Sequence, residues 1–208
     1  NTKVTVLSGP NHAEEIALQK PAATVIAARE LASAELVQQV LMNNYFRPYT
    51  SEDIIGVELA GSVKNIIALA GGMVAGLKLG DNCQSALMTR GLAEMARLGL
   101  KLGASPQTFF GLAGMGDLIA TCTSPHSRNR SAGLAFAAGK NLDEIVINKN
   151  GMVVEGINAT KVAYELSINI NVEMPITTGV FNIIFKNCLL KEELAILMNR
   201  SSKKEYLF

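Results

Sequence analysis

The sequence predicts a mainly α-helical protein that starts with the last part of an α/β domain. Three short runs of β-branched, apolar or aromatic residues alternate with helical segments in the first part, at 4–7, 22–28 and 45–49. From Asp53 onward nearly every segment has helical periodicity. We therefore expect an α/β segment over residues 1–52 and a helical domain over residues 53–208, packed tightly because no low-complexity linker separates them.

Each element of the α/β segment has its own sequence signal. The strand over 4–7 ends at a Ser-Gly-Pro turn. Asn11 is expected to cap a short helix that begins at Ala13 and carries carboxylates in its first turn. An amphipathic helix over 31–42 then separates the second and third strands.

The helical domain is expected to begin with three capped helices. Asp53 or Ser51 can cap a helix that runs through Lys64, Asp81 with Asn82 can cap the second, and Ser105-Pro106 starts the third. In the second helix, Arg90, Glu94 and Arg97 are spaced to form ion pairs on one face. Further helices are expected at 118–122, 132–138, 158–166, 175–185 and 191–198.

Composition excludes several classes of function. Hydrophobic residues make up 49% and charged residues 18%, which suffices for a buried core. A net charge of +1 argues against nucleic acid or an anionic membrane as the main partner. Three well-separated cysteines and two histidines, without C-x-x-C or H-E-x-x-H spacing, predict reduced thiols in a cytoplasmic protein and no metal site.

Two stretches bear on targeting and on membranes. The start has no initiator Met and no charged-then-apolar signal pattern, as expected for the interior of a longer polypeptide. The most apolar stretch, 54–79, has Lys64 near its middle, where a charge is unfavourable in lipid. We expect a buried helix rather than a membrane span.

Lys64 is the first candidate for chemistry. It is the only cation between Arg47 and Lys78, and it is surrounded in sequence by small residues that let other backbones approach. Desolvation lowers the pKa of a buried lysine toward neutrality, which suits proton transfer. The alternative is a lysine whose ammonium group extends into solvent.

Asp117 follows a glycine-rich stretch, 111–116. The glycines do not match G-x-G-x-x-G and no G-K-[ST] follows, so a nucleotide loop is not indicated. They are expected to turn the chain and place the Asp117 carboxylate at a cleft. Alternatively, Asp117 only caps a helix that begins at Leu118.

A polar segment, 121–130, is the third candidate. If a helix starts near Ser127, its free N–H groups point at an anion, and Arg128 can grip a phosphate with two hydrogen bonds. An ordinary solvated loop is the alternative.

Glu155 could accept hydrogen bonds from ribose hydroxyls or could merely start a helix. A lysine with a phosphate clamp suggests proton transfer on a phosphorylated carbonyl or alcohol, and reductase, aldolase and isomerase remain open.

The chain resembles the bacterial NAD(P)-dependent glycerol-3-phosphate dehydrogenases. Six short sequences carry the resemblance in family order over nearly the whole chain: LSGPNHAEE, GVELAGSVKN, TRGLAEM, GLAGMGDL, TCTS with SRNR, and VEG. The resemblance implies an N-terminal Rossmann domain and a C-terminal helical domain similar to that of 6-phosphogluconate dehydrogenases. It also implies reversible reduction of dihydroxyacetone phosphate to sn-glycerol 3-phosphate for phospholipid synthesis, with NAD or NADP as cofactor, in a homodimer.

The resemblance also implies residue roles. Lys64 matches the proton acceptor for alcohol oxidation. The implied substrate contacts are Gly9, Asn11, Lys64, Asp117, Ser127, Arg128 and Asn129. The implied cofactor contacts are Ala13, Arg128, Val153 and Glu155. Asn11 stands where many members carry serine or threonine, and it can still donate and accept hydrogen bonds.

The dinucleotide-binding motif does not occur ahead of Val4. We therefore expect this chain alone not to catalyse the reaction, and its preference for NAD or NADP does not follow from the sequence. Two other functions also fit the sequence. One is a non-catalytic helical dimerisation module. The other is a related hydroxyacid or sugar-acid dehydrogenase, which would not need the phosphate site at residues 127–129.

Overall fold

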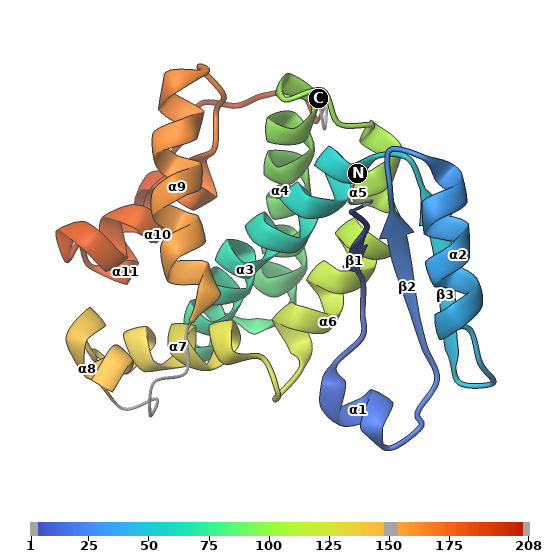
Figure 1. The fold of residues 1–208 in the computed structure, drawn as a ribbon. Coiled ribbons are helices and arrows are strands. Elements are labelled where there is room, and N and C mark those ends of the chain that lie inside the picture. Colours follow the sequence, from blue (N-terminus) through green and yellow to red (C-terminus); the bar gives the residue numbers. More distant parts are fainter. Residues whose placement is uncertain (1–3, 148–153, 206–208) are drawn as a thin grey trace.

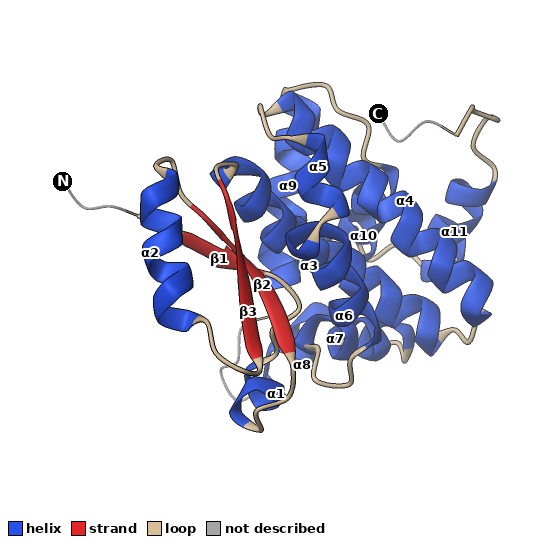
Figure 2. Ribbon diagram, turned by 90° about the vertical axis from the view of Figure 1, so that its right-hand side faces the viewer, coloured by secondary structure: helices blue, strands red, loops and turns tan. Residues whose placement is uncertain are grey.

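The computed structural model describes residues 4–147 and 154–205. Its α/β segment contains β1 (Val6–Ser8), α1 (Ala13–Ala17), β2 (Ala22–Ala27), α2 (Leu31–Leu41) and β3 (Phe46–Ser51). The strand order is β1-β2-β3, with β1 antiparallel to β2 and β2 parallel to β3. Figure 2 shows α2 on one side of this sheet and the helical part on the other. The predicted strand–helix alternation is confirmed.

The helical part contains ten segments among the described residues. They are α3 (Ile54–Gly76), α4 (Gly80–Lys101), α5 (Pro106–Phe110), the π-helical turn η1 (Leu112–Gly116), α6 (Asp117–Thr123), α7 (Arg128–Ala137), α8 (Leu142–Ile147), α9 (Glu155–Asn169), α10 (Pro175–Lys186) and α11 (Leu190–Met198). In Figure 1, α3 runs through the middle, with the sheet on one side and α9 to α11 on the other. The prediction of a mainly helical fold after a short α/β segment is confirmed.

The core is built around α3. Its apolar side chains, including Ile66, Ile67 and Leu69, are fully buried. Glycine lets α7 approach closely, since a Cβ on Gly72 would overlap the carbonyl oxygen of Arg130 and a Cβ on Gly133 would overlap that of Leu69. Within the described residues, α3 alone has the length and composition to cross a membrane, and 61% of its most apolar window is buried. Burial of most of this window favours a core helix over a membrane span.

Several predicted helix starts need correction. His12, not Asn11, precedes α1, and it makes no side-chain capping bond. Asp53 caps α3 as expected, because its side chain accepts a hydrogen bond from the Gly56 N–H at 2.8 Å. The helix expected to be capped by Asp81 and Asn82 begins earlier, at Gly80, which places Asp81 within its first turn.

Helix α8 was not predicted, although its sequence contains a recognisable start signal. The Asn141 side chain accepts from the Glu144 N–H at 2.9 Å, and the Glu144 side chain accepts from the Asn141 N–H at 2.8 Å. This reciprocal pair follows the logic of a capping box, with asparagine in place of serine or threonine.

The ion pairs predicted along α4 are wrong. Glu94 is fully buried, and its carboxylate accepts hydrogen bonds from the N–H groups of Ile176 and Thr177 and from the Thr177 hydroxyl. Arg97 instead donates to the backbone carbonyl of Glu173. Helical spacing placed these residues on neighbouring positions, but the packing of α10 decided what the carboxylate contacts. Burial raises the pKa of Glu94 to about 7, against the lowering effect of its hydrogen bonds.

Candidate functional site

The Lys64 ammonium group contacts a carboxylate rather than bulk solvent. Lys64 lies in the first half of α3, and its Nζ donates a hydrogen bond to Oδ2 of Asp117, the first residue of α6. The two side chains are 17% and 5% exposed. The alternative of a solvent-extended lysine is therefore wrong, and the two candidates form one buried ion pair.

Asp117 has two further partners from different elements. Thr121, one turn along α6, donates to Oδ1 at 3.1 Å, and Ser8 at the end of β1 donates to Oδ2 at 3.4 Å. Gly116 holds the N-cap position of α6, and no side-chain capping bond forms there. The interpretation of Asp117 as a mere helix cap is therefore wrong.

The glycine-rich stretch does turn the chain, as expected, but it does so as the π-helical turn η1. Gly114 packs directly against the backbone of Phe109, where a Cβ would overlap the Phe109 carbonyl. Only a residue without a side chain fits this approach. The tight turn sets the start of α6, and with it the position of the Asp117 carboxylate.

A second polar chain joins α3 to α7 and α9. Asn65, next to Lys64, donates to Glu155 Oε2 at 3.2 Å and accepts from Asn129 at 2.9 Å. Asn129 in turn accepts from the Gly156 N–H at 2.9 Å. Asn65 and Asn129 are buried. These bonds fix the starts of α7 and α9 beside the Lys64 turn of α3.

Helix α7 begins at Arg128, four residues before the helix predicted over 132–138, and so meets the condition set for an anion site near Ser127. Ser127 is buried and caps it, accepting from the Arg130 N–H at 3.2 Å. Arg128 is half exposed, and its guanidinium lies 3.6 Å from the Glu155 carboxylate. The first turn of a helix leaves N–H groups that are not used within the helix, so this end attracts anions.

The α/β segment supplies the other wall. Gly9 lies against β2, where an added Cβ would be 2.9 Å from the Thr24 Cα. Asn11 does not point toward Lys64 and instead donates to the Thr24 hydroxyl at 2.9 Å. The rings of His12 and His126 lie 6.3 Å apart, which brings the start of α1, and so Ala13, close to the turn before α7.

Several candidates therefore lie together around the first half of α3. We call Lys64, Asn65, Asp117, Asn129 and Glu155 the junction cluster. Val153 lies outside the described residues. Asn65 and Ser8 were not singled out from the sequence, and Thr121 was considered only as part of the polar segment 121–130. Thr121 lies one helical turn from Asp117, a spacing that could have linked the two.

Within residues 4–147 and 154–205, no group of three or more His, Cys, Asp or Glu side chains is placed to hold a metal ion. The three cysteines are free, and burial raises the pKa of the Cys122 thiol to about 12. The junction cluster therefore offers a proton-bearing amine, a fixed carboxylate and an anion-attracting helix start.

Solved structures share this architecture. The crystal structure of glycerol-3-phosphate dehydrogenase from Coxiella burnetii superposes with a TM-score of 0.92 at 40% identity, covering 96% of this chain and 61% of that one. The enzyme from Saccharomyces cerevisiae gives a TM-score of 0.82 at 27% identity, covering 92% and 58%. The chain shares with both enzymes an α/β segment that leads into a helical part, which is the architecture of two-domain dehydrogenases with a helical second domain.

Sequence comparison identifies the family within this class. The family profile "NAD-dependent glycerol-3-phosphate dehydrogenase C-terminus" matches residues 53–195, and the corresponding N-terminus profile matches residues 1–34. The chain belongs to the NAD-dependent glycerol-3-phosphate dehydrogenase family. Relatives named glycerol-3-phosphate dehydrogenase, NAD(P)+, from Bacillus cytotoxicus and Clostridium acetobutylicum are 55% and 53% identical over 97% and 99% of the chain. The chain spans about three fifths of their length (59% and 61%).

Proposed function

We propose that the whole protein reversibly reduces dihydroxyacetone phosphate to sn-glycerol 3-phosphate, and that this chain supplies its substrate-binding part. The observation that carries the proposal is the buried Lys64–Asp117 ion pair beside the capped start of α7. An amine that is shielded from water and held by a carboxylate is a positioned proton donor. Family membership supports the choice of substrate.

In the direction of reduction, Lys64 donates its Nζ proton to the carbonyl oxygen of the substrate. In oxidation, the neutral amine takes the hydroxyl proton back. Asp117 is a positioning residue, since its carboxylate aims the ammonium group while Thr121 and Ser8 hold the carboxylate. Asn65 sits one residue from Lys64, and its bonds to Asn129 and Glu155 prevent this turn of α3 from rotating.

The phosphate group of the substrate is assigned to the start of α7. Ser127 and Asn129 frame the first turn, and the Arg128 guanidinium can form two parallel hydrogen bonds to phosphate oxygens. Gly9 and Asn11 are assigned to the opposite wall of the substrate site. Because Asn11 contacts Thr24 in this structure, it would act by shaping the turn after β1.

The chain's own residues fit only the edge of a nicotinamide dinucleotide. Glu155 is more than half exposed at the start of α9, where its carboxylate can accept hydrogen bonds from ribose hydroxyls. Arg128 and Ala13 are assigned to the same edge, together with Val153. When bound, NAD or NADP supplies or receives the hydride. We propose that residues 1–52 are the end of the domain that holds it and that residues 53–208 form the substrate domain.

A matched pair of lysine variants tests the proposal in the intact protein that carries a dinucleotide-binding domain. Lys64→Met should lower the kcat for dihydroxyacetone phosphate about 10²- to 10⁴-fold, because it removes the proton donor. Lys78→Met, at an exposed residue just after the same helix, should leave turnover unchanged. Unchanged turnover in Lys64→Met, with both variants melting like the wild type, would remove Lys64 from the mechanism.

A substrate comparison separates this reaction from that of a hydroxyacid or sugar-acid dehydrogenase. Arg128→Lys should raise the KM for dihydroxyacetone phosphate while leaving the slow turnover of unphosphorylated dihydroxyacetone unaffected, because the bidentate contact serves only the phosphate. Equal losses with both substrates would argue against a phosphate clamp at Arg128.

The cellular context is proposed on the same basis. We propose that the product feeds glycerophospholipid synthesis in the cytoplasm and that the protein acts as a homodimer. Val162 and Ile168 on α9 are large apolar side chains exposed to solvent, and they offer a surface for a second copy. Sedimentation of the wild type and of Val162→Glu tests the dimer. A monomeric wild type would refute it, and dimerisation without binding of glycerol 3-phosphate would favour the non-catalytic module.

A further inference from the structure

An open cavity lies at a different place from the junction cluster. It has a volume of about 480 Å³ and is lined by the end of α3, α4, α10, α11 and the segment after α11. None of the junction cluster residues lines it. From Lys64 to Ala70, the nearest residue of α3 that lines the cavity, the helix rises about 9 Å at 1.5 Å per residue. The proposed catalytic function does not account for this space.

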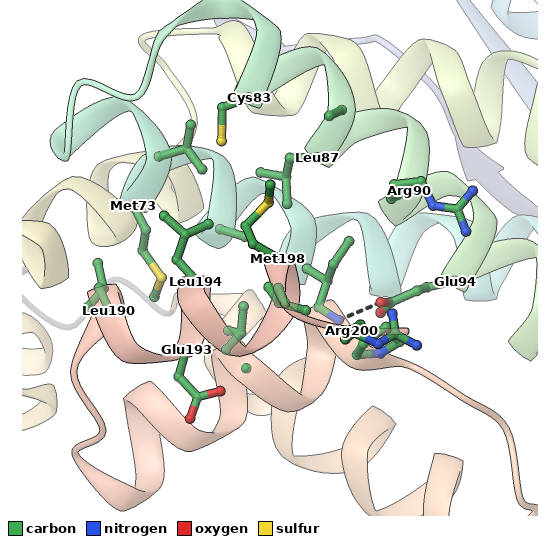
Figure 3. Close-up of a pocket in the computed structure, with 18 of the residues that line it drawn as sticks. Met73, Cys83, Leu87, Arg90, Glu94, Leu190, Glu193, Leu194, Met198 and Arg200 are labelled. Atoms are coloured by element: carbon green, nitrogen blue, oxygen red, sulfur yellow. Dashed lines mark hydrogen bonds between the residues drawn. The ribbon is translucent and has the colours of Figure 1, made fainter. Parts of the chain in front are cut away.

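Apart from Glu193, whose carboxylate accepts a hydrogen bond from Asn182, the cavity is apolar at one end and charged at the other (Figure 3). Met73, Leu190 and Leu194 lie at the apolar end, and Leu87, Cys83 and Met198 continue that wall. Arg90, Glu94 and Arg200 lie together at the opposite end. A ligand that fills the whole cavity must therefore combine an apolar body with a polar head.

Cations outnumber carboxylates at the charged end. Five cations line the cavity, namely Arg90, Arg97, Arg200, Lys203 and Lys204, against the carboxylates of Glu94, Glu173 and Glu193. Glu173 pairs with Arg200 and Lys203. Arg97 donates to the Glu173 backbone carbonyl, a neutral group, at 2.9 and 3.1 Å.

Glu94 interacts with the arginine charge only at longer range, because its carboxylate oxygens accept the N–H groups at the start of α10 rather than an arginine hydrogen bond. With every carboxylate of the lining counted, the cavity keeps a formal excess of two positive charges next to its apolar channel. An anionic head group would satisfy this excess, whereas a neutral or cationic one would not.

We propose that this cavity binds a single-chain amphiphile with a phosphate monoester head, the alkyl chain lying between α3, α4 and α11 and the head between Arg90 and Arg200. The volume lies within the range of about 300–1,000 Å³ typical of small-molecule sites. A phosphate monoester carries about −1.5 to −2 charge at neutral pH, which matches the excess, and guanidinium groups bind it with two hydrogen bonds each.

The same charges argue against a second copy of this chain as the occupant. In a two-fold symmetric contact the same surface meets itself, so the arginine cluster would approach its own copy. Like charges brought together in a contact oppose association. A separate anionic ligand carries no such penalty.

Binding of alkyl phosphates to the intact protein tests the proposal. Isothermal titration with octyl, decyl and dodecyl phosphate, each below its micelle concentration, should give affinities that rise about fourfold per added methylene until the channel is full. Dodecyl phosphate should bind more tightly than dodecanoate, and dodecanol most weakly. Equal affinity for dodecanol and dodecyl phosphate would overturn the assignment of the head group.

Cys83 gives a local readout, because its half-buried thiol lines the cavity while Cys188 does not. Dodecyl phosphate should slow alkylation of Cys83 by iodoacetamide, measured by mass spectrometry, and leave the rate at Cys188 unchanged. Equal protection at both cysteines, or at neither, would place the amphiphile elsewhere.

Three charge variants complete the test. Arg90→Gln should weaken dodecyl phosphate binding and reduce its salt dependence, whereas Glu173→Gln should strengthen binding because it releases Arg200 and Lys203. Lys101→Gln, an exposed cation at the end of the same helix as Arg90, should change nothing. Turnover without amphiphile should be unchanged in all three.

Blocking the channel separates the ligand from a second copy. Leu194→Trp should abolish dodecyl phosphate binding while sedimentation stays as in the wild type. If Leu194→Trp instead converts a dimer to a monomer, the cavity is a contact between copies and the proposal fails.

Discussion

Two buried carboxylates, Asp117 and Glu94, sit at opposite sides of the α3 core and have different partners. Asp117 faces the ammonium group of Lys64 and receives two hydroxyl groups. Glu94 has no cation within ion-pair distance, and it receives the backbone N–H groups at the start of α10. Both are almost fully buried, so burial by itself does not distinguish a functional carboxylate from a structural one.

The difference lies in what each carboxylate holds in place. Glu94 joins two helices through backbone groups that any sequence at 176 and 177 would offer, so its effect is on stability. Asp117 holds a side chain that can exchange a proton, so its effect should be on turnover. Site-directed changes at the two positions should therefore separate into activity losses and stability losses.

The largest effect is expected for Asp117→Asn in the intact protein. Asparagine can keep the Thr121 bond, but it leaves the Lys64 ammonium group without its carboxylate. We expect kcat for dihydroxyacetone phosphate to fall about 10²-fold or more, with a melting temperature within a few degrees of the wild type. Steady-state kinetics and thermal melts check this. Normal turnover in Asp117→Asn would show that the Asp117 carboxylate, like that of Glu94, has only a structural role.

Glu94→Ala should show the opposite behaviour. It leaves the N–H groups of Ile176 and Thr177 buried without an acceptor, which costs about 3 kcal/mol or more of unfolding free energy. Denaturant unfolding at pH 5.5, where the carboxyl is protonated, measures this loss. Turnover of the folded fraction should equal that of the wild type, and a specific loss of kcat would show that Glu94 acts in the reaction.

The pH dependence of stability follows from the raised pKa of Glu94, which burial lifts from 4.5 to about 7. Between these values the folded state binds the proton more tightly than the unfolded state does. The contribution is therefore fully present below pH 4.5 and is lost as pH rises through 7, by about 3 kcal/mol. Glu94→Gln, a neutral isostere, should lack this decline. Identical pH profiles for the two proteins would contradict the assignment.

The sequence anticipated the elements better than the contacts. Asp53, Pro106 and Ser127 start helices through local chemistry. The start at Pro106 was predicted outright, Asp53 was one of two predicted caps, and Ser127 was considered as a start although the predicted helix began at 132. The capping pair at Asn141 and Glu144 is also local, so α8 could have been found from the sequence.

The pairing of Lys64 with Asp117 could not be predicted from spacing. The two residues are 53 positions apart, and their contact depends on the π-helical turn η1 and on the packing of α6 against α3. The contacts of Glu94 could not be predicted from spacing either. Its spacing from Arg90 and Arg97 fixes a face of α4, but what packs on that face is a long-range property of α10.

The smallest effect is expected at a third carboxylate, Glu173, which has charged partners without burial. Arg200 and Lys203 pair with it at the surface, and the hydrogen bond from Lys203 lowers its pKa. Exposed ion pairs contribute at most about 1 kcal/mol, because water and salt screen them. Glu173→Gln should therefore shift the unfolding free energy by less than this amount, measured by urea denaturation at low and high salt. A loss as large as that of Glu94→Ala would mean that charge pairing, rather than burial with satisfied hydrogen bonds, sets the stability of this end of the molecule.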